Sequence, residues 1–181
     1  MAAEDNLNIV LVGMMGAGKS YVGAKLAKLL VHFKYVDTDE LIERKARLSI
    51  PEIFEKHGEE YFRKLEAEVI KQVSSRKNQI ISVGGGAFTK PDNIRALKKN
   101  GLTFYLKAST GTLYERIKNE THRPLLNGDF TQETVEALLN KRQKYYMQAD
   151  FIIDTNNMPA YVIIDNIIEE CENYDKQRTS R

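Results

Sequence analysis

The chain has 181 residues, of which 42% are hydrophobic and 29% charged, and its formal net charge at pH 7 is +2. This length and composition predict one globular domain with a substantial core. A net charge so close to zero does not favour binding to nucleic acid. No apolar run approaches the ~18 residues that a membrane-spanning helix needs. We therefore expect neither nucleic acid nor a membrane as a partner.

Cysteine usage and the N-terminal segment predict a cytoplasmic protein. Cys171 is the only cysteine, so no intramolecular disulfide can form, which fits a reducing compartment. Residues 1–6 are polar and acidic and lack the pattern of a signal peptide. The three histidines, His32, His57 and His122, are scattered without the spacing of metal ligands, so we expect no zinc site.

Short apolar runs that predict strands alternate with segments of helical periodicity. The predicted strands are Ile9–Val12, Phe33–Val36, Ile80–Val83, Leu102–Leu106 and Phe151–Asp154. The predicted helices are a segment from about Lys19 to Leu30, Leu41–Ala46, a short helix that stops at Gly58, Glu59–Ser74, Pro91–Lys99, Thr110–Ile117, Thr131–Gln148 and Pro159–Tyr174. This alternation is typical of a three-layer α/β/α fold, in which helices cover both faces of a parallel sheet.

Three local signals refine these boundaries. Ser49-Ile-Pro-Glu52 is typical of a helix start, with proline just inside and glutamate following. Asn100-Gly101 predicts a left-handed cap at the end of the preceding helix. Lys118–Thr131 is polar and contains Pro124, which predicts a loop.

The most informative segment is Gly13–Ser20, Gly-Met-Met-Gly-Ala-Gly-Lys-Ser, which lies between a predicted strand and a predicted helix. It matches the phosphate-binding pattern G-x-x-x-x-G-K-[ST], whose glycines let backbone N–H groups surround an anion at the positive end of a helix. We expect Lys19 to reach the β- and γ-phosphates and Ser20 to hold Mg²⁺. A chance glycine-rich turn is the alternative, but this pattern arises by chance in only about one per cent of such chains.

Unusual clusters also follow the second and third predicted strands. Asp37 suits water-mediated Mg²⁺ binding, and Asp39 could orient or deprotonate an acceptor hydroxyl, unless Thr38 or Asp39 only caps the next helix. Gly84–Gly86 indicates close approach of backbone N–H groups to a ligand, or else a tight turn. Since ligands bind beyond the carboxyl ends of parallel strands, these clusters and the phosphate loop predict one site. No acidic residue of the Walker-B type ends the third strand, so the metal would depend on Ser20 and Asp37.

Three arginines, Arg63, Arg123 and Arg142, are further candidates, because guanidinium groups bind carboxylates and phosphates bidentately. Any one of them could lie on a solvated surface in a chain with 27 basic residues. Arg123 is the strongest candidate, because its loop is well placed to close over phosphates as a lid.

Taken in order along the chain, these motifs resemble those of shikimate kinases. The resemblance extends from about Asn8 to Glu170. The phosphate loop alone is shared by a very large superfamily, whereas the combination of motifs is much more specific. The matching segments are the phosphate loop, Asp37-Thr-Asp39, Phe62-Arg63-x-x-Glu66, Gly84–Gly86, Arg123-Pro-Leu-Leu126 and Arg142-x-x-Tyr145.

The resemblance implies phosphorylation of the 3-hydroxyl of shikimate by ATP with Mg²⁺, a step of aromatic amino-acid biosynthesis. It also implies the fold of nucleoside monophosphate kinases, with a five-stranded parallel sheet. The whole chain, 1–181, would then be a single P-loop kinase domain with a substrate-binding region at about 33–62 and a mobile lid at about 118–131. We expect a monomer.

Matched position by position, the resemblance implies a role for each candidate residue. The catalytic residues would be Lys19, Asp39 and Arg123. The nucleotide would contact Gly13, Gly16, Ala17, Gly18, Lys19, Ser20, Tyr21, Arg116, Arg123 and Pro159, with the adenine between Arg116 and the loop of Pro159. Shikimate would contact Asp39, Arg63, Gly84, Gly85, Gly86 and Arg142, the last arginine and Arg63 holding its carboxylate. The metal would be held by Ser20 and, through water, by Asp37. Whether Asp39 removes the proton or only orients the hydroxyl stays open.

Two other functions remain as alternatives. Another metabolite kinase of the same fold, such as a gluconate kinase or a nucleoside monophosphate kinase, would share the loop and lid but not the set of Arg63, Gly84–Gly86 and Arg142. A non-catalytic nucleotide-binding module would need no acceptor site, and the intact Asp39 and Arg123 argue against it.

Overall fold

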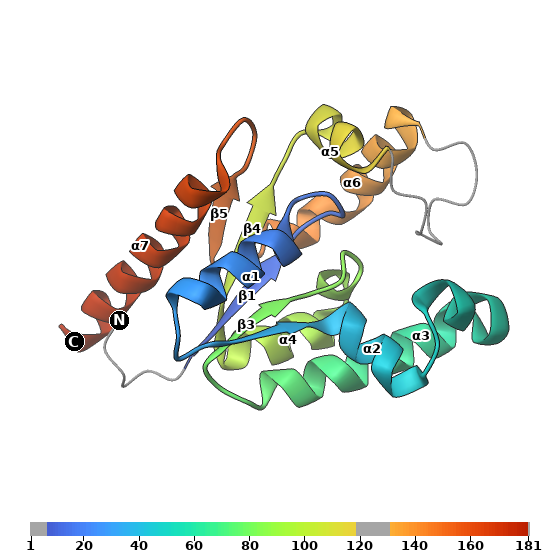
Figure 1. The fold of residues 1–181 in the computed structure, drawn as a ribbon, viewed down its shortest axis with the longest axis horizontal. Helices are drawn as coiled ribbons and strands as arrows, with labels where there is room; N and C mark the ends of the chain where they lie inside the picture. Colours follow the sequence, from blue (N-terminus) through green and yellow to red (C-terminus); the bar gives the residue numbers. More distant parts are fainter. Residues whose placement is uncertain (1–6, 119–130, 181) are drawn as a thin grey trace.

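The structure is a computed structural model that describes residues 7–118 and 131–180. In these residues five parallel strands form one sheet in the order β2-β3-β1-β4-β5, with helices on both faces (Figure 1). The strands are β1 (Asn8–Val12), β2 (Lys34–Asp37), β3 (Gln79–Ser82), β4 (Gly101–Lys107) and β5 (Phe151–Asp154). The α/β/α class and the five-stranded parallel sheet predicted from the sequence are confirmed.

The strand order decides which face each helix covers, because parallel crossovers are right-handed. The chain moves from β1 to β2 in one direction along the sheet and from β2 to β5 in the other. Consequently α1 lies on one face, where α7 joins it, whereas α3 and α4 lie together on the opposite face (Figure 1). The helices are α1 (Lys19–Leu29), α2 (Thr38–Ala46), α3 (Ile50–Ser74), α4 (Pro91–Lys99), α5 (Thr110–Ile117), α6 (Gln132–Tyr146) and α7 (Ala160–Thr179), with a short 3₁₀ helix η1 (Ala87–Thr89).

The central strand β1 places the phosphate loop in the middle of the sheet. All five residues of β1 are buried, because β3 and β4 flank it and helices cover both faces. A strand buried on both faces needs a continuous apolar run instead of an alternating one. The loop that follows therefore begins from a fixed point in the middle of the sheet.

Helix α3 begins and breaks where the sequence predicts. Ser49 accepts a hydrogen bond from the backbone N–H of Glu52, and the Glu52 carboxylate accepts one from the backbone N–H of Ser49, which together form a capping box. Gly58 interrupts the helix with φ 78° and ψ 173°. The chain therefore changes direction between the first turns of α3 and the longer part that carries Arg63.

Two local predictions are wrong. Asn100-Gly101 is not a left-handed cap: Asn100 has φ −130°, and Gly101 is the first residue of β4. Glycine is needed there because a Cβ atom would lie 2.9 Å from both the Leu97 carbonyl oxygen and Val10 Cγ2. The second error concerns only a boundary: Leu41–Ala46 is helical as predicted, but α2 begins earlier, at Thr38.

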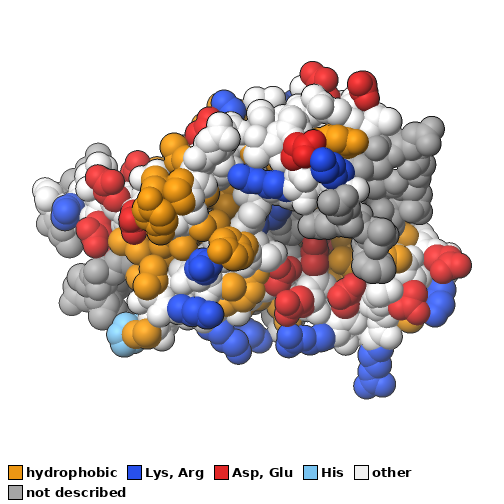
Figure 2. All heavy atoms as spheres, turned by 45° about the horizontal axis from the view of Figure 1, so that its top comes forward, with side chains coloured by type: hydrophobic (Ala, Val, Ile, Leu, Met, Phe, Trp, Pro, Cys, Tyr) orange, Lys and Arg blue, Asp and Glu red, His pale blue; other side chains and the backbone are white. Residues whose placement is uncertain are grey.

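Apolar side chains cluster on the surface over α1 and α7 (Figure 2). Tyr21, Leu29 and Tyr161 are exposed there and border a groove between the two helices. None of the described helices is both long enough and apolar enough to span a bilayer.

Candidate active site

The glycines of the phosphate loop are needed for two different physical reasons. Gly13, Gly16 and Gly18 all have positive φ, at 143°, 76° and 91°. A Cβ atom on Gly13 would lie 2.8 Å from the Leu106 carbonyl oxygen, and one on Gly16 would lie 2.7 Å from Ile117 Cγ2. Gly18 meets no such obstacle but caps α1 in a left-handed conformation that other residues rarely adopt.

Lys19 lies across the loop that it follows. Its Nζ donates hydrogen bonds to the carbonyl oxygens of Gly13 at 3.0 Å and Met14 at 2.9 Å. The ammonium group therefore lies beside the positive end of α1, where both favour an anion. This arrangement fits the phosphates of a nucleoside triphosphate.

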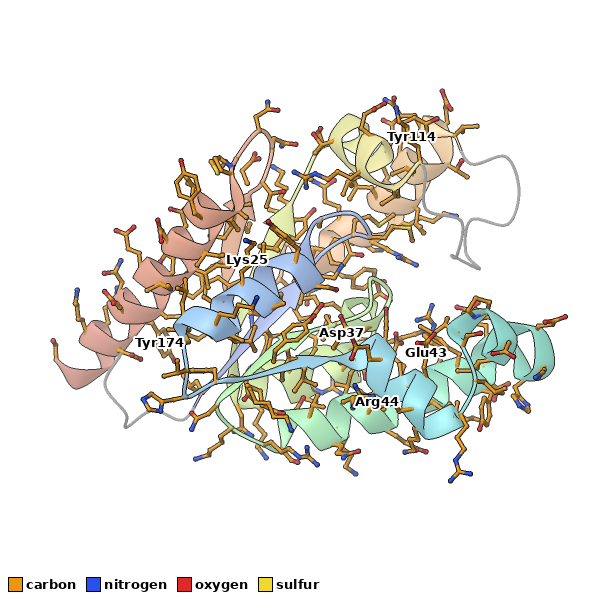
Figure 3. The ribbon with its side chains drawn as sticks, viewed as in Figure 1. Lys25, Asp37, Glu43, Arg44, Tyr114 and Tyr174 are labelled. Carbon is orange, nitrogen blue, oxygen red and sulfur yellow. The ribbon has the colours of Figure 1, made fainter. Side chains whose placement is uncertain are left out.

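Asp37 lies at the start of α2 (Figure 3). Ser20 contacts it, although 17 residues separate the two in the sequence. Ser20 Oγ donates to Asp37 Oδ2 at 2.8 Å, and the Tyr35 hydroxyl donates to the same oxygen at 3.1 Å. Asp37 Oδ1 accepts from the backbone N–H of Asp39 at 3.0 Å, so Asp37 is the N-cap of α2. Neither Thr38 nor Asp39 is this cap, and the carboxylate that caps the helix is also the one that reaches Ser20.

This pair fits Mg²⁺, which prefers hard oxygen ligands and keeps much of its water. In the described part of the chain, no cluster of three or more His, Cys, Asp or Glu side chains could hold a metal ion alone. A hydroxyl and a carboxylate beside a phosphate loop suit a metal that also takes oxygens from phosphate and water.

Three side chains from different parts of the chain pack against the backbone of Gly84–Gly86. A Cβ atom on Gly84 would lie 2.6 Å from Asp39 Oδ1, and one on Gly86 would lie 2.6 Å from Arg63 NH1. A Cβ atom on Gly85 would lie 3.2 Å from Arg142 NH1. The segment lacks side chains because these three groups lie against it, and a tight turn alone would not require three glycines.

Arg63 is held by two glutamates from its own helix. Its Nε and NH2 donate to Glu59 Oε1 at 3.1 and 3.0 Å, and its NH1 donates to both oxygens of Glu66 at 3.1 and 3.0 Å. Burial raises the pKa of Glu66, which is 1% exposed, although the charge of Arg63 acts in the opposite direction. Burial alone would lower the pKa of Arg63, but the two glutamates outweigh it and the pKa is raised. Arg63 is therefore a fixed cation and not a solvated surface residue.

Arg142 differs from Arg63 in having no carboxylate at salt-bridge distance among residues 7–118 and 131–180. It lies on α6, is 8% exposed, and its NH1 is 4.0 Å from Met14 Sδ. A buried cation without a paired anion is costly. This position therefore favours an anionic ligand.

One cavity of about 710 Å³ joins these groups, a volume typical of small-molecule sites. The predicted site residues that line it are Gly16, Gly18, Lys19, Ser20, Tyr21, Asp37, Asp39, Arg63, Gly84, Gly85, Gly86, Arg116 and Arg142. Gly13, Ala17 and Pro159 are not part of this lining. Arg123 and nearly all of the predicted lid, residues 119–130, lie outside the described residues.

The cavity also has an apolar wall that sequence reasoning missed. Ile50, Pro51 and Phe54 line it from the first turns of α3, and Phe62 lines it from beyond the break. The rings of Phe54 and Phe62 lie 4.9 Å apart across that break. Phe62 belongs to one of the motifs that carry the family resemblance, but the only sequence signal for Phe54 was apolar spacing, which is equally typical of core residues.

Arg116 connects the phosphate loop to the segment after β5. Its NH1 donates to the Gly16 carbonyl oxygen at 3.3 Å, and its NH2 donates to the Thr155 carbonyl oxygen at 3.1 Å. Pro159 lies just before α7, where its carbonyl oxygen accepts from the backbone N–H of Val162 at 3.1 Å. Arg116 therefore borders the phosphate loop on the side where the chain leaves β5.

A phosphate loop that shares a cavity with fixed arginines and an aspartate has room for two substrates, a phosphoryl donor and an anionic acceptor. The class is therefore a P-loop kinase acting on a small molecule. Residues 15–172 match the family model of shikimate kinase, and the chain belongs to this family.

Individual relatives agree with this assignment. Shikimate kinase of Thermodesulfovibrio yellowstonii is 43% identical over 172 residues, which are 95% of this chain and 99% of that protein. The structure of shikimate kinase from Acinetobacter baumannii in complex with shikimate is similar with a TM-score of 0.89 and 37% identity, covering 94% and 96% of the two chains. A gluconokinase from Sinorhizobium meliloti, at 16% identity and a TM-score of 0.62, with 96% and 98% covered, shares the fold alone.

Proposed function

We infer that the chain transfers the γ-phosphoryl group of ATP to the 3-hydroxyl of shikimate, giving shikimate 3-phosphate and ADP. The family uses ATP as donor with Mg²⁺, in aromatic amino-acid biosynthesis. One observation carries the inference to this chain: Asp39, Arg63 and Arg142 lie against three successive glycines in the cavity that contains the phosphate loop. The likeness to a gluconokinase shows the fold alone and does not favour gluconate as the acceptor.

The donor side follows from the phosphate loop. Its backbone N–H groups and the end of α1 would hold the phosphates, and Lys19 would exchange its bonds to loop carbonyls for bonds to the β- and γ-phosphates. Ser20 and, through water, Asp37 would hold Mg²⁺, which neutralises phosphate charge when bound. We assign the remaining nucleotide contacts to Gly13, Gly16, Ala17, Gly18, Tyr21, Arg116, Arg123 and Pro159.

The acceptor side follows from the order of side chains along Gly84–Gly86. Asp39 lies at the Gly84 end, whereas Arg142 and Arg63 lie at Gly85 and Gly86. A ring with a hydroxyl on one side and a carboxylate on the other matches this separation of charge. The two arginines would bind the carboxylate, Asp39 would bind the hydroxyl, and the wall of Phe54 and its apolar neighbours would cover the ring.

Transfer would then be in line between the two bound substrates. Lys19, Mg²⁺ and Arg123 would stabilise the charge that develops on the transferred group, and Asp39 would orient the hydroxyl or accept its proton. Arg123 takes this role from its match to the lid arginine of the family. The region at about 33–62 would serve as the substrate-binding part of a single kinase domain.

We also propose that the protein acts as a monomer in the cytoplasm. Cys171 is buried, and burial raises the pKa of its thiol to about 12, so this cysteine is a core residue and not a reactive thiol. Light scattering during size-exclusion chromatography tests the monomer: a mass near 20.7 kDa supports it, and a mass near twice that value contradicts it.

A coupled ADP-release assay with ATP and Mg²⁺ tests the acceptor. We expect turnover with shikimate and only background rates with gluconate and AMP. Turnover with one of those acceptors and none with shikimate would contradict the proposed function.

A further inference from the structure

Tyr146, the last residue of α6, connects the hydrophobic core to the acceptor side of the cavity. It is 0% exposed, and its hydroxyl donates to the Gly85 carbonyl oxygen at 2.5 Å. The same hydroxyl lies 3.9 Å from Met14 Sδ in the phosphate loop. The Tyr146 ring packs against that of Tyr105 with centroids 5.2 Å apart. The ring therefore fills the core while the hydroxyl reaches the site.

Arg142 lies one helical turn before Tyr146, so both side chains project from the same face of α6. Both contact the same two residues. Arg142 NH1 is 4.0 Å from Met14 Sδ and would lie 3.2 Å from a Cβ atom on Gly85. The buried arginine and the buried phenol thus both lie against Gly85, the arginine near where a Cβ atom would be and the phenol at the carbonyl oxygen.

Glycine segments need such a restraint, because they have more backbone freedom than any other residue type. Gly85 has no side chain that could fix the orientation of its own peptide groups. Its carbonyl is fixed by a donor, and Tyr146 is that donor. If the carbonyl turned, the surface against which Arg142 lies would change shape.

We propose that Tyr146 is a positioning residue for the acceptor site: its hydroxyl fixes the Gly85 peptide and thereby the place of Arg142. This inference rests on the proposed function, since it concerns the carboxylate that Arg142 would bind. Tyr146 acts through Gly85 and Arg142. Burial raises the pKa of Tyr146 to about 12, even though the charge of Arg142 and a hydrogen bond with the Arg142 side chain act to lower it. The phenol therefore keeps its proton throughout the neutral range.

A purely structural role would depend on the ring and not on the hydroxyl. Tyr146→Phe keeps the ring, its packing against Tyr105 and the helix, and removes only the donor. The matched control is Tyr105→Phe, which removes a hydroxyl from the other ring of the same buried pair.

Isothermal titration of shikimate into the protein without nucleotide measures the effect directly. For Tyr146→Phe we expect the Kd for shikimate to rise about 10-fold, the scale of one lost buried hydrogen bond, while the Kd for Mg·ADP changes less than about 2-fold. For Tyr105→Phe we expect both Kd values to stay within about 2-fold of wild type.

A second variant covers the case in which Tyr146→Phe folds poorly. Tyr146→4-aminophenylalanine retains an N–H donor at the same place, and we expect it to bind shikimate within about 3-fold of wild type. Unchanged shikimate affinity in Tyr146→Phe, or a loss in the 4-aminophenylalanine variant as large as in the Phe variant, would overturn the inference. A wild-type protein that binds no shikimate would instead overturn the proposed function.

Discussion

Gly86→Ala tests whether the segment Gly84–Gly86 lacks side chains because other side chains pack against its backbone. Gly86 has φ −89° and ψ −18°, a conformation that alanine adopts without strain. The added Cβ would lie 2.6 Å from Arg63 NH1 and 3.0 Å from Arg63 NH2. These atoms are the far end of a flexible side chain, so the chain can fold by displacing the guanidinium, but Arg63 then leaves the position where Glu59 and Glu66 hold it.

We expect this displacement to cost one charge-assisted hydrogen bond to the acceptor, about 1.5–3 kcal/mol, or about 10- to 150-fold in shikimate KM. The KM for ATP should change less than about 2-fold, because Gly86 lies at the acceptor end of the cavity. Steady-state kinetics with each substrate varied in turn separates the two constants.

Gly111→Ala is the matched control, since Gly111 lies in α5 and an added Cβ would meet nothing within 4 Å. Alanine there should leave both KM values unchanged and stabilise the helix by about 0.5–1 kcal/mol. A folded Gly86→Ala enzyme with normal shikimate KM would refute the reasoning about the glycine segment.

Three further changes address other parts of the site. Asp37→Asn should raise the Mg²⁺ concentration for half-maximal activity about 10-fold with little change in shikimate KM, and a magnesium titration with normal midpoint would contradict the pairing of Asp37 with Ser20. Arg63→Ala should weaken shikimate binding by about 1.5–3 kcal/mol and leave ATP binding nearly unchanged, as calorimetry can measure, whereas equal loss of both would reject the assignment. Burial raises the pKa of Glu66 above its usual 4.5, so the folded protein holds this proton more tightly than the unfolded chain does. The free energy of unfolding should therefore fall as the pH rises from 4.5 through the raised pKa. Urea unfolding of Glu66→Gln should lack this decline, and an unchanged pH profile would show that Glu66 is not its source.

The phosphate loop could be predicted from sequence because its requirements are local. Its three glycines all have positive φ, and its lysine and serine follow directly in the chain. The contacts of Gly13 with Leu106 and of Gly16 with Ile117 are long-range and could not be predicted. The sheet could be predicted for a related reason, since the buried β1 has the continuous apolar run that a parallel strand needs.

The acceptor site was harder to predict from the sequence, because it is formed by contacts between residues that are far apart in the chain. Gly84–Gly86 could be recognised as unusual, but nothing in the sequence alone shows that Asp39, Arg63 and Arg142 lie within 3.2 Å of where Cβ atoms would be. Gly101 shows a similar difficulty: a glycine after a helix predicts a left-handed cap, whereas the actual cause is close contact with the Leu97 carbonyl oxygen and with Val10 in the neighbouring strand. Residue chemistry indicated what Asp39 and the arginines could bind, and the family resemblance assigned Arg63 and Arg142 to the shikimate carboxylate. Their geometry came only from the fold.

Identification of the product tests the central claim most directly. ATP, Mg²⁺, shikimate and the purified protein should give one new phosphate ester, and phosphorus-31 and proton NMR should show the phosphorus coupled to the proton on carbon 3 of the ring. Appearance of ADP with inorganic phosphate and no ester, or coupling to a proton on another carbon, would contradict the account.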